Sequence, residues 1–190
     1  MSRPKYLIRQ ADQSEAPLVS YLRLASLMSL DMAGHSLATV RNFMNALPDV
    51  DPTLLGAGSY YLADNDGDLI GGAGWSVLPL TFRGQSLVEQ DGSRLAFTLG
   101  ENSVLIRGFF LDPDAGRQSA GAALLSHIEE DVMRAGYSGA DIVVPTSSQL
   151  RYRFLGFKAA RKLVMKSQGL AVLPLVQMRK TLAPRCALAA

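Results

Sequence analysis

The run from Arg117 to Ala123 has the residue types best suited to holding a ligand. It reads RQSAGAA and follows an apolar stretch that ends at Pro113. Where a strand passes through small residues into a helix, several backbone N–H groups lack a partner inside the helix, and such groups bind phosphate. A run of small residues also lets a helix pack closely on a sheet. Both interpretations are open at this stage.

The other reactive side chains form no recognisable set. Cys186 is the only cysteine and lies in the tail APRCALAA, which excludes an internal disulfide and a metal site with paired thiolates, so we expect no metal. Four carboxylates are candidates for a general base by their charge alone: Asp64, Asp68, Glu89 and Glu101.

Basic residues are scattered, and the net charge is only +2. A nucleic-acid-binding protein usually gathers its Lys and Arg residues on one face, so we expect no nucleic-acid partner. The nearest approach to a cluster lies between Arg151 and Lys162, which we interpret as a solvated face, with attraction of an anionic ligand as the alternative. His127 is interpreted as structural, whereas Trp75 could line a ligand pocket or fill the core.

Length and composition indicate one α/β domain. A chain of 190 residues with 48% hydrophobic and 19% charged content can bury one substantial core, and we expect a single domain over 1–183 with a tail at 184–190. No apolar run of about 18 or more residues and no secretory signal pattern is present, so we expect a cytoplasmic protein without a membrane partner.

In the first half of the chain, KYLIR predicts a strand, and Asp12 with Glu15 at capping-box spacing predicts a helix to about Met32. SLATVRNFMNAL predicts a second helix, and PDVDPTLLGAG a connector. SYYLAD and LIGGAGWSVL, joined by NDGD, predict a hairpin. The stretch 79–102 has weak periodicity and predicts a loop, with or without a short helix. Its length favours a lid or pocket wall over a mobile surface excursion.

In the second half, SVLIRGFFLDP predicts an apolar strand, and the following segment through Tyr137 predicts a helix. The buried stripe expected on that helix is Leu125, Ile128, Val132 and Ala135. ADIVV predicts a strand, SSQLRYRFL a short helix, and GFKAARKLVMK and LAVLPLVQMRKTL two closing strands.

This order of elements, together with two segments, resembles the GNAT superfamily of N-acetyltransferases. LIRGFFLDPDAGRQSAGAALLSHIEEDVMRAGY is similar to the family's cofactor-binding strand, pyrophosphate loop and following helix, and LRYRFLGF to its leucine-tyrosine-x-x-x-glycine-phenylalanine segment. The resemblance covers about Ser59 to Leu182. It implies an α/β (α+β) fold with a mixed, mostly antiparallel sheet, flanked by helices and splayed at the cofactor strand.

The resemblance also implies acetyl-CoA as co-substrate and transfer of its acetyl group to an amine of a small molecule or peptide. The backbones of Phe109, Phe110 and Leu111 would pair with the pantetheine arm. The diphosphate would lie against Arg117, Gln118, Ser119, Ala120, Gly121 and Ala122. The family's two glycine positions align with Ser119 and Gly121, or in a second register with Gly121 and Ala123.

Tyr152 matches the family tyrosine that protonates the leaving thiolate. A phenol has a pKa of ~10 and a thiol of ~8.5, so full proton transfer is uphill by about 1.5 units, or roughly 2 kcal/mol, which a hydrogen bond to the thiolate partly offsets. The alternative is a tyrosine that only packs at a helix end. Many members have an asparagine where this chain has Pro145.

Two other functions stay open on the sequence alone. The first is a non-catalytic module that binds or senses acyl-CoA. The second is an unrelated nucleotide-binding domain that uses the same helix start. The resemblance also allows a homodimer formed through the closing strands.

Overall fold

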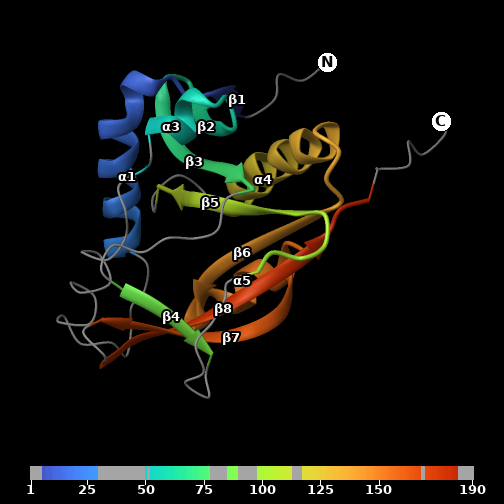
Figure 1. Cartoon of the computed structure of the whole chain (residues 1–190). Helices are drawn as coiled ribbons and strands as arrows, with labels where there is room; N and C mark the ends of the chain where they lie inside the picture. Colours follow the sequence, from blue (N-terminus) through green and yellow to red (C-terminus); the bar gives the residue numbers. More distant parts are fainter. Residues whose placement is uncertain are drawn as a thin grey trace.

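The computed structural model describes residues 6–29, 50, 52–77, 85–89, 98–112, 117–167 and 170–183. These contain one 8-stranded sheet with the strand order β1-β2-β3-β5-β6-β8-β7-β4 (Figure 1). Neighbouring strands run antiparallel, except that β5 and β6 run parallel. The predicted mixed, mostly antiparallel sheet is therefore confirmed.

The first half of the chain supplies one side of the sheet. Its elements are β1 (Leu7–Gln10), α1 (Ala16–Ser29), α3 (Pro52–Gly56), β2 (Tyr60–Asn65) and β3 (Asp68–Ser76). The capping box is confirmed: the Asp12 carboxylate accepts from the Ser14 N–H, and the Glu15 carboxylate from the Asp12 N–H, each at 2.8 Å. The expected connector 48–58 is partly wrong, because Pro52 starts the short helix α3 there. The helix expected over 36–47 lies outside the described residues.

The rest of the chain supplies the remaining strands and two α-helices. They are β4 (Gln85–Glu89), β5 (Ser103–Leu111), α4 (Arg117–Arg134), β6 (Gly139–Pro145), α5 (Gln149–Phe154), β7 (Lys158–Ser167) and β8 (Leu170–Thr181). The prediction of a loop over 79–102 is wrong at β4, which pairs with β7 at the edge of the sheet. Strand pairing across the fold outweighs the weak local pattern of that segment.

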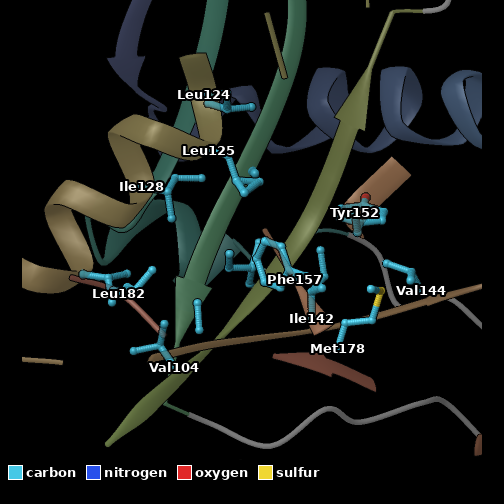
Figure 2. Close-up of a cluster of buried hydrophobic side chains, with 14 of the residues drawn as sticks. Val104, Leu124, Leu125, Ile128, Ile142, Val144, Tyr152, Phe157, Met178 and Leu182 are labelled. Atoms are coloured by element: carbon cyan, nitrogen blue, oxygen red, sulfur yellow. The ribbon is translucent and has the colours of Figure 1, made fainter. Parts of the chain in front are cut away.

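The helices cover opposite faces of the sheet. On β2, Tyr60 and Leu62 join a core with α1 and α3, whereas Tyr61 between them joins a core with α4. Figure 2 shows the α4 core, with Leu124, Leu125 and Ile128 over the strands. Three residues of the stripe expected on α4 are buried, but Ala135 is exposed because the helix ends at Arg134.

Candidate active site

Strands β5 and β6 are paired only at their beginnings. Their pairing runs from Ser103 with Gly139 to Leu105 with Asp141, although β5 continues to Leu111. Figure 1 shows the two strands separating toward α1. The second half of β5 therefore has no described strand on its β6 side, so backbone groups along that edge can pair with an extended ligand. The splay predicted at this strand is confirmed.

A β-bulge lies where the open edge begins. Gly74 pairs with Arg107 and Gly72 with Phe110, so Ala73 alone faces two residues of β5. The first of these, Gly108, has a φ of 62°, and a Cβ there would lie 3.0 Å from the Tyr60 ring. The Tyr60 hydroxyl donates to the Gly108 carbonyl at 2.7 Å. Glycine and Tyr60 together fix this bend of the strand.

The small residues at the start of α4 divide between two sides of the helix. Ala120 is 1% exposed and packs on the sheet, and a Cβ on Gly121 would lie 2.9 Å from Leu111 Cδ1. Ser119 and Ala122 are exposed. Close packing on the sheet is therefore enough to explain why positions 120 and 121 carry small residues. The outward side of the first turn is left for a ligand.

The first turn of α4 has the backbone groups needed for an anion. The helix begins at Arg117, and the N–H groups of an α-helix's first four residues have no partner within the helix. Gln118 follows in the same turn, and the side chains of these two residues lie outside the description. The Ser119 hydroxyl lies 2.7 Å from the Tyr6 hydroxyl. Tyr6, the residue just before β1, therefore lies beside this turn.

Tyr152 lies beside the cofactor strand proposed from the sequence. Its ring meets Phe109 of β5 edge to face at a centroid distance of 5.9 Å, and Phe157 at 6.2 Å. The residue is 7% exposed, and Figure 2 shows it at the opposite end of the core from Leu182. Burial raises the pKa of the Tyr152 phenol well above its usual value, and Arg151 offsets part of this.

The Tyr152 hydroxyl makes no hydrogen bond to any residue in the described part of the chain. A phenol that stays protonated at neutral pH and has an unused donor can give a hydrogen bond or a proton to a ligand. The fold thus brings Tyr152 and Phe109 together from segments that are distant in sequence.

Most other candidates have structural partners. Trp75 donates from Nε1 to Asp131 of α4 at 2.8 Å, which favours the core over a ligand pocket. The His127 ring packs on Tyr61 at 4.7 Å, as expected for a structural residue. Among the carboxylates, Asp64 accepts from the Gly67 N–H in the hairpin turn at 2.7 Å, and Glu89 pairs with Arg161 at 3.5 Å. Among the described residues no group of His, Cys, Asp and Glu could hold a metal ion.

Sequence reasoning missed a buried charge where the strands part. Asp141 is fully buried on β6 and accepts from the Gly100 N–H at 2.6 Å and from Arg179 Nε at 2.8 Å. Nearby, Gln177 Nε2 donates to the Thr98 carbonyl at 3.1 Å. An isolated Asp in ADIVV carries no local signal of these contacts. They tie the end of the 79–102 segment to the sheet.

The geometry agrees with comparisons to known proteins. A model of the acetyltransferase (GNAT) family matches residues 32–157, about two thirds of the chain. The chain belongs to the GNAT acetyltransferase family. It is an acyltransferase of the N-acetyltransferase type, and the splayed sheet is the fold of that family. A comparison with curated protein sequences found no match.

Solved structures of GNAT proteins share the fold at low sequence identity. PaiA N-acetyltransferase from Thermoplasma acidophilum, in complex with coenzyme A, is 15% identical with a TM-score of 0.62, over 95% of this chain and 99% of that one. YncA from Salmonella typhimurium, with its cofactor acetyl-CoA, is 16% identical with a TM-score of 0.61, over 98% and 99%. Ribosomal-protein-alanine N-acetyltransferase from Brucella melitensis is 16% identical with a TM-score of 0.58, over 93% and 99%.

The described helices of this GNAT protein include none that is long and apolar enough to cross a membrane. The edge strand β4 comes from the segment between β3 and β5, for which the sequence predicts a loop.

Proposed function

We propose that this GNAT enzyme transfers the acetyl group of acetyl-CoA to an amine of a small molecule or peptide. The observation that carries the proposal is the juxtaposition of the open edge of β5 with the free hydroxyl of Tyr152. Acetyl-CoA supplies an acetyl thioester: a C–N bond forms to the amine, the C–S bond breaks, and the thiolate takes up a proton. Two neighbours of similar fold hold coenzyme A or acetyl-CoA, which supports this choice of co-substrate.

The open edge of β5 is suited to the pantetheine arm, which carries two amide groups. Backbone groups between Ile106 and Leu111 can pair with those amides as they would with a neighbouring strand. The bulge at Gly108 turns the backbone within this stretch, and the Tyr60 hydroxyl holds the turned carbonyl. A strand bent in this way can direct one N–H at the thioester oxygen, where negative charge develops during transfer.

The diphosphate fits the outward side of the first turn of α4. Free N–H groups and the positive end of the helix dipole both favour an anion there. Ser119 and Ala122 are small and exposed, so they allow close approach. Gly121 contributes by letting α4 pack close to Leu111, which sets the distance between this turn and the open edge of β5.

Tyr152 is proposed to protonate the leaving thiolate. Its raised pKa keeps the phenol protonated, and the same apolar surroundings raise the pKa of a thiol placed beside it. Because both groups are shifted in the same direction, proton transfer stays close to the modest uphill step expected for a free phenol and thiol. The Phe109 and Phe157 rings hold the phenol in position from two sides.

The test compares Tyr152→Phe with Tyr137→Phe, a control tyrosine that packs on Trp75. Release of free coenzyme A thiol from acetyl-CoA is followed with a panel of amines, and coenzyme A binding is measured by calorimetry. We expect Tyr152→Phe to lower kcat roughly tenfold to a thousandfold, the scale for a positioned acid, while the Kd of coenzyme A stays within about twofold. Equal kcat for both variants would remove Tyr152 from the reaction. Failure of the wild type to bind coenzyme A would overturn the proposed function.

A further inference from the structure

A serine of α1 lies on the open edge of β5. The Ser26 hydroxyl donates to the Leu111 carbonyl at 2.7 Å and lies 3.4 Å from the Leu111 N–H. Ser26 is 5% exposed and Leu111 is 8% exposed, so the contact is buried. One side chain from a helix thus meets both backbone groups of the last residue of the strand.

Those two backbone groups face the open side of β5. The next residue, Asp112, donates its N–H to the Ile70 carbonyl of β3 at 2.8 Å. Along a strand, the backbone groups of successive residues point to alternate sides, so those of Leu111 point away from β3. They point to the side where β6 has already separated. An arm added to this edge would need the same N–H and carbonyl that Ser26 contacts.

The body of α1 is fixed, whereas the Ser26 hydroxyl can leave without moving it. Val19 is 0% exposed and anchors the helix in the core with Tyr60 and Phe110. Rotation about the single Cα–Cβ bond of serine moves its hydroxyl to another staggered position. Both contacts to Leu111 are lost in that one rotation.

We propose that Ser26 closes the open edge of β5 in the ligand-free enzyme and competes with the pantetheine arm for the backbone of Leu111. The inference rests on the proposed function. In the ligand-free state Ser26 satisfies buried groups that would otherwise lack a partner, and it gives them up when the arm pairs with them. Ser26 therefore lowers the affinity for coenzyme A and stabilises the empty enzyme.

The test uses Ser26→Ala with Ser20→Ala as a matched control. Ser20 lies on the same helix, and its hydroxyl accepts from the Val50 N–H at 3.2 Å. Alanine favours the helix, so both variants should fold. We expect Ser26→Ala to bind coenzyme A about fivefold or more tightly than the wild type, because binding no longer breaks the contact to Leu111. Ser20→Ala should keep the wild-type Kd.

Thermal unfolding gives a second readout. Without ligand, both variants should have a lower Tm than the wild type, since each loses a hydrogen bond to the backbone. With saturating coenzyme A, the ligand-induced rise in Tm should be larger for Ser26→Ala only. Ser26→Cys, whose thiol bonds weakly, should have a Kd between those of the wild type and Ser26→Ala.

If the wild type binds coenzyme A and Ser26→Ala binds it equally or more weakly, the proposed competition is overturned and the proposed function stands. A wild type that does not bind coenzyme A would overturn both.

Discussion

Ser119→Asp should weaken coenzyme A binding while it leaves the stability of the protein nearly unchanged. Ser119 is exposed and is the third residue of α4, so its side chain lies at the positive end of the helix dipole. A carboxylate there stabilises a helix by about 0.3–1 kcal/mol, which offsets loss of the exposed hydrogen bond to Tyr6. We expect the free energy of unfolding to change by less than about 1 kcal/mol.

The effect of the same charge on a bound diphosphate has the opposite sign. Two negative charges placed roughly 6 Å from a carboxylate repel it by about 1.4 kcal/mol in bulk water, and by about four times as much at an effective dielectric constant of ~20. For an exposed site we expect a value in the lower half of this range. The Kd of coenzyme A should then rise about tenfold to a hundredfold at low salt.

Calorimetry on Ser119→Asp and Ser119→Asn provides the measurement. The two side chains have the same shape and differ in charge, so steric effects and loss of the Tyr6 contact cancel in the comparison. In about 1 M salt, where the screening length is ~3 Å, the difference should shrink. If the two variants bind coenzyme A equally at low salt, the diphosphate does not lie at the start of α4 and our reasoning about this turn is refuted.

Two further predictions concern the sheet. Gly108→Ala should lower the free energy of unfolding by about 2–3 kcal/mol, because the alanine would adopt a left-handed conformation and its Cβ would crowd the Tyr60 ring. The same variant should weaken coenzyme A binding in calorimetry. The control is Gly136→Ala, at another positive φ with open space around it, which should leave binding unchanged. Burial and Asp131 raise the pKa of Tyr61 to about 12, so the unfolded state releases its proton first and stability should fall as pH rises from ~10 toward that value. Denaturant titrations across this range should show a shallower fall for Tyr61→Phe, and identical pH profiles would contradict the assignment.

The parts of the fold that were predicted correctly carry their information locally. The hairpin of β2 and β3 follows from alternating residues around NDGD, where Asp66 and Gly67 both adopt positive φ. The capping box accounts for the 3-10 turn Gln13–Glu15, which leads directly into α1, and the apolar period accounts for α4. Each of these signals lies within about one element of the chain, where spacing alone determines which side chains meet.

The features that were missed depend on contacts between distant segments. Strand β4 exists because Gln85–Glu89 pairs with β7, which begins at Lys158. Ser26 is an ordinary helical serine in sequence, and only the fold places it on Leu111. The sequence around Trp75 suits a pocket and the core equally, and only the fold places Asp131 beside it. In each case the local pattern permits two outcomes and tertiary packing selects one.

Asp141 ties the end of the 79–102 segment to the sheet, so this segment does more than connect β3 to β5. A carboxylate that is fully buried needs nearby donors, since burial without them costs several kcal/mol. Here the donors come from Arg179 on β8 and from Gly100 at the end of the 79–102 segment, and a Cβ on Gly100 would lie 2.5 Å from Arg179 Nε. Asp141 is also the last residue of β6 that pairs with β5. One buried charge thus joins both halves of the sheet and the returning segment at the point where the two strands part. The described end of that segment is therefore held to the sheet at the opening between β5 and β6.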